Sequence, residues 1–156
     1  MAHVVPTLEF AFKITMMMGA REKYPAMPNG LRRGFTGAAG GTVEGPALNG
    51  RVVENSGGDF PLVDADGNVR FNAHYILEAD DGTRIYMHNR GLRFATRELN
   101  QRINANEVVP MDQFYFRVAP EFEAPVGPHD WMNRTLFVGS ADRREDHGIF
   151  HYYAVR

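Results

Sequence analysis

The 156-residue sequence contains no cysteine, only two serines and no surplus of positive charge. The lack of cysteine excludes disulfides and thiolate chemistry, and it fits a reducing cytoplasm. Neither Ser56 nor Ser140 lies in the strand-turn-helix elbow that holds the nucleophile of a serine hydrolase. A net charge of -2 and an isoelectric point near 6.3 argue against nucleic acid as the main partner, because backbone phosphates require a basic surface.

Long apolar runs are also missing. No stretch approaches the roughly 18 apolar residues of a membrane span, and the first ten residues contain neither the basic nor the apolar segment of a secretory leader. We therefore expect a soluble, cytoplasmic protein that does not associate with membranes. The length is that of one domain, so the sequence predicts a single domain over residues 1–156.

What the sequence does contain is the alternating pattern of β-strands, most clearly in residues 69–91. The apolar side chains fall on alternate positions, as in a strand with one buried face. They are Phe71, Ala73, Tyr75, Leu77 and Ala79 in the first run, and Ile85 and Met87, followed by Asn89, in the second. Asp80, Asp81 and Gly82 between the runs accept the left-handed dihedrals of a tight turn. The stretch therefore predicts a β-hairpin.

Short strand patterns recur along the rest of the chain at a spacing of roughly ten residues. They cover residues 7–15, 42–53, 60–63, 113–118, 135–139 and 148–156, whereas residues 16–19 are predicted as a flexible segment and residues 24–30 and 119–130 as proline-containing loops. Leu99 and Ile103, four residues apart, give a helical pattern over residues 96–105. Many short strands favour an all-β fold, and closure of the sheet removes exposed strand edges. We predict an antiparallel β-barrel of about 8–10 strands with one short helix.

Polar side chains occupy the other face of the hairpin, namely Asn72, His74, Tyr86, His88 and Arg90. If this face lines the barrel interior, His74 and His88 are candidates for proton transfer, and the other three are candidates for substrate binding. Facing strands would bring these side chains within about 5 Å of one another. The alternative is that they form the solvent face of the sheet, with the apolar face in the core.

Tyr115 and Arg117 share the polar face of another strand pattern. A phenol beside a guanidinium group binds a carboxylate or stabilises an oxyanion, so both residues are candidate catalytic groups. The alternative is a surface pair, or an arginine that holds the following proline-rich loop.

Two further groups are candidates for substrate binding. Arg33, Glu44 and Asn49 flank a glycine-rich segment that would let a ligand approach the backbone, although a turn held by an ion pair explains them equally well. Trp131 and Asn133 lie at the entrance of a strand, where the indole could cap a cavity mouth. Tryptophan is, however, more often a packing residue of the core or rim.

The glycines and histidines do not form the motifs of nucleotide or metal sites. Gly37, Gly40 and Gly41 are not followed by the Lys-Ser/Thr ending and the helix of a phosphate loop. His147 and His151 have the spacing of helical metal ligands but lie in a β pattern, and the other histidines are not closely spaced. We predict no metal and no other cofactor.

Several short segments occur in the order seen in one known family. They are Gly40-Gly41-Thr42-Val43-Glu44-Gly45-Pro46, Asp80-Asp81-Gly82, Asn89-Arg90-Gly91, Tyr115-Phe116-Arg117 with Pro120 and Phe122, and Trp131-Met132-Asn133 with Phe137-Val138-Gly139. On these residues the chain resembles the bacterial and fungal β-barrel family catalogued as domain of unknown function 3237, from the first strand to the last residue. The resemblance implies a barrel around a central cavity but no particular reaction. Asn72, His74 and Ala79 depart from the acid, arginine and threonine that are usual or frequent in the family at these positions.

An aromatic content of 12% and eight methionines, together with the polar candidates above, predict an enzyme. It would bind an apolar, aromatic or ketone-bearing small molecule in the barrel cavity and perform cofactor-independent acid-base chemistry of the isomerase, cyclase or lyase type. One alternative is a non-catalytic barrel that binds or carries a small hydrophobic ligand. Another is an oligomeric module that uses exposed aromatics such as Tyr152 and Tyr153. We also expect a homo-oligomer, because the aromatic terminal strand could bury its outer face against a second copy.

Overall fold

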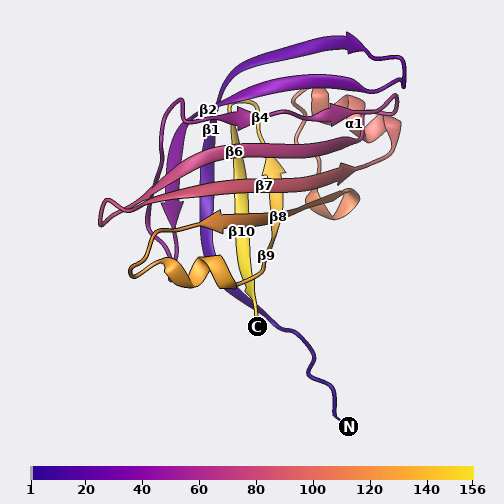
Figure 1. Ribbon diagram of the computed structural model, residues 1–156. Helices are drawn as coiled ribbons and strands as arrows, with labels where there is room; N and C mark the ends of the chain where they lie inside the picture. Colours follow the sequence, from indigo (N-terminus) through magenta and orange to yellow (C-terminus); the bar gives the residue numbers. More distant parts are fainter. Residues whose placement is uncertain (1) are drawn as a thin grey trace.

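The strands of this protein form one closed antiparallel sheet in a computed structural model that describes residues 2–156. The ring closes because β1 pairs with β10 on one side and with β2 on the other (Figure 1). The strands are β1 (Leu8–Ala26), β2 (Arg32–Glu44), β3 (Gly50–Val52), β4 (Gly58–Asp59), β5 (Leu62–Val63), β6 (Val69–Ala79), β7 (Arg84–Phe94), β8 (Tyr115–Glu123), β9 (Phe137–Arg143) and β10 (His147–Val155). Between β7 and β8 lie α1 (Arg97–Asn104) and the 3-10 helix η1 (Met111–Gln113), and η2 (Asp130–Arg134) precedes β9. The predicted all-β antiparallel barrel of about 8–10 strands with one short α-helix is confirmed.

The β6–β7 hairpin forms as the alternating pattern predicts. Leu77 of β6 is cross-strand partner to Ile85 of β7, and both side chains are fully buried. The turn is closed by Asp81, whose Oδ1 accepts a hydrogen bond of 2.9 Å from the backbone N–H of Thr83. Gly82 adopts a φ of +86°, which a side chain would disfavour. The apolar face of the hairpin therefore points into the barrel.

The core is packed densely at one end of the barrel. Phe12 of β1 lies against Phe122 and Tyr152, with ring centroids 5.9 and 5.4 Å apart, and Phe137 packs edge-on to Phe122 at 5.0 Å. Met132 of η2 is also buried there, at 1% exposure. Each fully buried side chain of this size contributes about 1.5–3 kcal/mol of hydrophobic stabilisation, so this end of the barrel holds the fold together.

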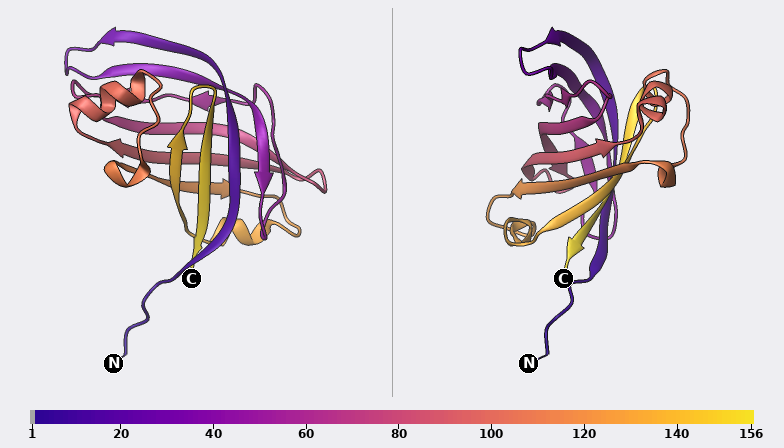
Figure 2. Two further views of the ribbon diagram at one scale, coloured as in Figure 1. Left: turned by 180° about the vertical axis from the view of Figure 1, so that it is seen from behind. Right: turned by 90° about the vertical axis from the view of Figure 1, so that its right-hand side faces the viewer.

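Helix α1 lies near the other end, where the β1–β2 hairpin projects (Figures 1 and 2). It begins at the N-cap residue Thr96, whose Oγ1 accepts from the backbone N–H of Leu99, and it matches the predicted helix within one residue at each end. No helix within residues 2–156 is both long and apolar enough to cross a membrane.

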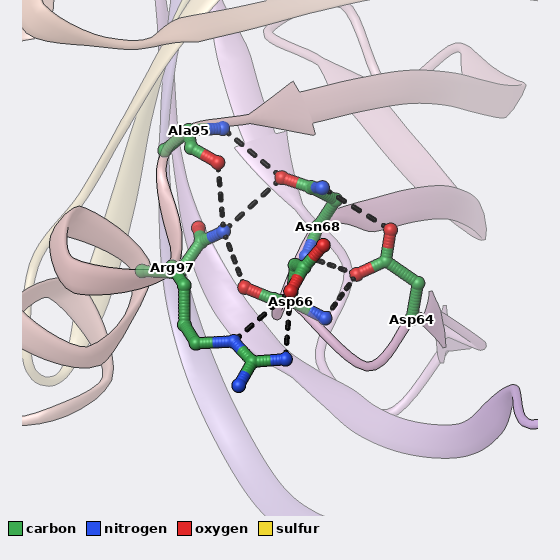
Figure 3. A network of polar contacts seen from close by, with 6 residues as sticks. Asp64, Asp66, Asn68, Ala95 and Arg97 are labelled. Carbon is green, nitrogen blue, oxygen red and sulfur yellow. Dashed lines mark hydrogen bonds and ion pairs between the residues drawn. The ribbon is translucent and has the colours of Figure 1, made fainter.

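A network of polar contacts fixes α1 to the turn between β5 and β6 (Figure 3). The side-chain amide of Asn100, 1% exposed, donates to the backbone oxygen of Asp66, to Oδ1 of Asn68 and to the backbone oxygen of Ala95. Arg97 forms an ion pair of 2.9 Å with Asp66. The helix is thereby held in place by hydrogen bonds as well as by packing.

The predicted flexible segment over residues 16–19 is strand in the structure, and the two predicted loops begin as strands. β1 continues through residues 16–19 and reaches Ala26, because it pairs with β2 as far as Arg32 and three register shifts absorb the irregular residues. β8 continues through Pro120 to Glu123. Proline is tolerated there because β8 pairs with β9 only at Arg117 and Val118, so that the rest of the strand has one free edge.

Candidate functional site

A cavity of about 550 Å³ opens at the end of the barrel that carries α1 and the projecting hairpin. The right view of Figure 2 looks toward this end, with the hairpin and α1 on different sides of it. Apolar side chains of five strands line much of the cavity, namely Met16, Ala38, Val69, Phe71, Ala73, Phe116, Val118 and Phe150. Phe71 and Phe116 stack with centroids 4.9 Å apart. The walls therefore favour a flat, apolar molecule.

Asp59 brings a carboxyl group to this cavity from the two-residue strand β4. β4 lies between β2 and β6, where Asp59 pairs with Thr36 and Ala73. β4 can lie this close to both neighbouring strands only because the two residues before Asp59 are glycines. A Cβ on Gly57 would lie 1.9 Å from the carbonyl oxygen of His74, and one on Gly58 would lie 2.5 Å from that of Thr36. The glycines thus let β4 enter the sheet and present the acid.

The environment of Asp59 favours the protonated carboxyl group. Burial raises its pKa from the ordinary value of 3.8 to about 6, although hydrogen bonds from the backbone of Asn72 and Phe60 and the charge of Arg33 oppose the rise. The backbone N–H of Asn72 donates to Oδ1 at 2.8 Å. A carboxyl group with a pKa near 6 can both donate and accept a proton at neutral pH, as a general acid-base catalyst must.

Two tyrosines lie deeper in the barrel. Tyr75 is 4% exposed, and burial raises the pKa of its phenol, with a further contribution from the charge of Asp59. Tyr152 is fully buried, its pKa is likewise raised by burial, and its hydroxyl accepts a hydrogen bond of 2.9 Å from Nδ2 of Asn89. Both phenols therefore remain protonated at neutral pH and are available as hydrogen-bond donors.

The polar face of the hairpin lies on the outside of the barrel, so the interpretation that it lines the interior is wrong. Asn72 and Arg90 are exposed, and His74, Tyr86 and His88 are half-buried outside the cavity wall. These side chains do come together. The rings of His74 and His88 stack with centroids 4.1 Å apart, His74 Nδ1 contacts the hydroxyl of Tyr86, and His88 Nε2 lies 2.6 Å from Oδ1 of Asn72. The physical reason is that Ala73, Tyr75 and Leu77, on the alternate positions, bury far more apolar surface.

Tyr115 and Arg117 also point outward, because Phe116 and Val118 occupy the inner positions of β8. The guanidinium of Arg117 lies 5.5 Å from the centroid of the Tyr115 ring, as a surface cation-π pair. The expected inward-facing pair is therefore absent from the cavity.

Of the other sequence candidates, only Arg33 lines the cavity, and its Nη1 donates to the backbone oxygen of Phe60 at 2.7 Å. Glu44 forms an exposed ion pair with Lys13, and the side chain of Asn49 holds both the N–H and the oxygen of Gly45 in a turn.

Trp131 and Asn133 belong to η2. The indole of Trp131 packs against Phe137, and the amide of Asn133 holds Ala124 by two hydrogen bonds. Their predicted place at a cavity mouth is wrong, because η2 lies at the densely packed end of the barrel. Within the described residues, no group of three or more His, Cys, Asp or Glu side chains is arranged to hold a metal ion.

The sequence did contain a signal for part of the cavity site. Asn89 and Arg93 lie on the same inward face of β7 as Ile85 and Met87. A polar residue on an otherwise apolar face is unusual and indicates a candidate functional site. Asp59 had no such signal, because it follows a glycine pair that reads as an ordinary turn.

The closed ring of strands and its interior cavity define a small antiparallel β-barrel protein with an acid in an apolar pocket. The chain belongs to the family described as "Protein of unknown function (DUF3237)", which matches residues 6–155.

Relatives share both the fold and the length of this chain. A UPF0311 protein of Rhodopseudomonas palustris is 33% identical over 154 residues, which cover 97% of this chain and 99% of the relative. The crystal structure of a β-barrel-like protein from Acinetobacter baumannii matches with a TM-score of 0.86 and 29% identity, over 99% of each chain. The hydroalkoxylation enzyme phnH of Penicillium herquei is a more distant relative, 31% identical over 150 residues, with 96% of this chain and 84% of the enzyme covered. One relative of this chain is thus named as an enzyme.

Proposed function

We propose that the cavity is the active site of a cofactor-independent enzyme that performs acid-base chemistry on an apolar, aromatic or ketone-bearing small molecule. The observation that carries this proposal is Asp59, an acid whose pKa is raised to about 6 inside an apolar cavity. Desolvated carboxyl groups with a pKa near the working pH are characteristic of general acid-base catalysis.

The reaction that we propose is intramolecular addition of a hydroxyl group across a carbon-carbon double bond. The carboxyl group of Asp59 donates its proton to one alkene carbon, and the substrate oxygen forms a bond to the other. The resulting carboxylate then accepts the proton of the hydroxyl group. One O–H bond and one carbon-carbon π bond are replaced by a C–O and a C–H bond without oxidation or reduction, so proton transfer alone is sufficient. The similarity to a hydroalkoxylation enzyme supports this class of reaction.

Tyr75 has a supporting role in this scheme. Its phenol remains protonated because burial raises its pKa, and it lines the same cavity as Asp59. A carbonyl oxygen of the substrate would accept a hydrogen bond from this hydroxyl and gain negative charge as the adjacent double bond reacts. A ketone conjugated to the double bond would benefit most from this contact.

The experiment uses 2′-hydroxychalcone, an aromatic ketone whose phenol adds to its own conjugated double bond. The purified protein is expected to accelerate ring closure over the uncatalysed rate, followed by the loss of chalcone absorbance. In D2O, the product would carry deuterium on the carbon next to the carbonyl. Asp59→Asn is expected to lower the rate by at least about 100-fold, because general acid-base catalysis contributes that much or more.

Two further variants test whether the cavity or the outer face of the hairpin carries the activity. Asp112→Asn alters an exposed acid in η1, away from the cavity, and should behave as the unaltered protein. His74→Ala tests the outer face of the hairpin. Loss of turnover in His74→Ala with retention in Asp59→Asn would move the chemistry to that outer face. Tight binding of aromatic ketones without turnover of any phenol that bears an alkene would instead identify a carrier.

A further inference from the structure

Unsatisfied polar atoms are concentrated in the cavity. Within residues 2–156, four buried side-chain atoms have no hydrogen-bond partner: the Tyr75 hydroxyl, Asn89 Oδ1, Arg93 Nε and Asn100 Oδ1. All four residues line the same cavity. A buried polar atom without a partner costs about 1–3 kcal/mol, so the fold does not retain several of them in one place for stability. Their position indicates a site for a ligand with polar groups.

Arg93 is the charged member of this set. It lies on the inner face of β7 and is 3% exposed. Its Nη2 donates to the backbone oxygen of Gly67 at 3.4 Å, which is a long hydrogen bond, and its Nε donates to nothing. Burial lowers its pKa from 12.5 to about 10, with a further contribution from the charge of Arg143. The guanidinium group is thus desolvated and lacks a compensating anion.

Arg143, at the end of β9, is a second cation at this cavity. Its Nη1 donates to Oδ1 of Asn104 at 3.3 Å, and burial lowers its pKa as well. Two guanidinium groups that repel each other in a low-dielectric pocket are unfavourable unless an anion joins them.

The acids near this cavity do not provide that anion. Asp66 pairs with Arg97, and Asp142 pairs with Arg144 at 2.5 Å. Glu22 accepts a hydrogen bond from the hydroxyl of Tyr24, and Asp59 accepts one from the backbone N–H of Asn72. Asp64 accepts hydrogen bonds from the backbone N–H groups of Asp66 and Asn68 and from the Asn68 side chain (Figure 3). Within the described residues, neither Arg93 nor Arg143 has an ion-pair partner. The positive charge of the two arginines is therefore uncompensated.

We propose that Arg93 and Arg143 form an anion subsite that binds the carboxylate of an otherwise apolar, aromatic ligand. A carboxylate matches the planar donor fork of guanidinium, and it would provide an acceptor for Arg93 Nε. The aromatic body of the ligand would lie against the stacked rings of Phe71 and Phe116. This inference shares the cavity with the proposed function and names the substrate class more closely, but it concerns binding and does not require turnover.

The test compares 2-naphthoate with its methyl ester by isothermal titration calorimetry. The two molecules share the aromatic body and differ in the charge of the carboxyl group. The unaltered protein is expected to bind 2-naphthoate at least about tenfold more tightly, since charge-assisted hydrogen bonds to guanidinium are stronger than neutral ones. Arg93→Gln and Arg143→Gln should each reduce this preference several-fold while leaving the affinity for the ester unchanged.

Arg84→Gln is the matched control. Arg84 lies on the same strand as Arg93 but points outward, where it pairs with Glu78. This variant should retain the full preference for 2-naphthoate.

Other outcomes would overturn the subsite. Equal affinity for the two ligands, binding of neither, or a preference that survives in both cavity variants would each do so. If Arg93→Gln does not fold, as judged by circular dichroism, Arg143→Gln gives the same answer. A protein that prefers 2-naphthoate but does not cyclise any phenol would contradict only the proposed reaction.

Discussion

Replacing Asp59 with asparagine removes a titrating group from the cavity while keeping the shape of the side chain. The amide oxygen that Asp59→Asn introduces can still accept the hydrogen bond from the Asn72 backbone N–H, which measures 2.8 Å in the structure. The substitution therefore isolates the effect of charge. Because burial raises the pKa of Asp59, the carboxyl group resists ionisation in the folded protein more than in the unfolded chain.

The sign and size of the effect follow from proton linkage. The pKa rises from 3.8 to about 6, so at pH values below about 4 the carboxyl group is protonated in both states and costs nothing. Between about pH 4 and pH 6 the unfolded chain releases the proton first, and the stability of the folded protein falls. Above about pH 6 the loss is complete. It amounts to about 2–3 kcal/mol, after allowance for the partial exposure of the side chain.

The assay is urea unfolding of the unaltered protein and of Asp59→Asn from about pH 2.5 to about pH 8, at one protein concentration. The difference in the free energy of unfolding between the two proteins should be constant below about pH 4. It should then rise in favour of the variant, by about 2–3 kcal/mol, and level off above about pH 6. Other titrating groups are common to both proteins and cancel in the difference.

The reasoning would be refuted if the free energies of unfolding of the two proteins changed with pH in parallel. A constant offset at every pH would mean that Asp59 has the same pKa in both states and is solvated in the folded protein. A difference that grows in the opposite direction would mean that Asp59 is ionised and stabilised by a partner such as Arg33. Either result would also remove the basis of the proposed proton transfer.

The remaining predictions concern packing, the helix network and assembly. Gly57→Ala places a Cβ 1.9 Å from the oxygen of His74, so it should displace β4 and lower both the melting temperature and the turnover of 2′-hydroxychalcone. Leu77→Ala removes a fully buried side chain and should cost about 2–5 kcal/mol in urea unfolding. Asn100→Ala deletes three hydrogen bonds of the network in Figure 3 and should speed amide hydrogen exchange in α1 more than in β6. The homo-oligomer expected from the sequence is tested by size-exclusion chromatography with light scattering, and the monomer mass at all concentrations would contradict it. One of its two named aromatics, Tyr152, lies inside the barrel, so the outer face of β10 depends on Tyr153 and its neighbour Phe10.

The fold was largely predictable because most strands show their buried face in the sequence. The hairpin of β6 and β7 has local alternation and a turn of Asp and Gly, and α1 has a capping threonine and a four-residue apolar spacing. The predicted strand ends were wrong where a strand pairs with another that is distant in the sequence. β1 extends to Ala26 because β2 lies beside it, and β8 passes through Pro120 because β9 no longer pairs with it there. Neither condition is visible in the residues of the strand itself.

The sequence by itself determined the closed β architecture, the apolar faces and the family, since alternation and turn residues act over a few positions. The alternation of β7 also places Asn89 and Arg93 on the inner face, although the predicted hairpin ends at residue 91 and Arg93 was not among the candidates. Only the tertiary structure decided that the histidine face of the hairpin lies outside and that Asp59 lies within. The pKa of a carboxyl group depends on which distant strands exclude water from it, and β4 acquires those neighbours only when β2 and β6 close around it.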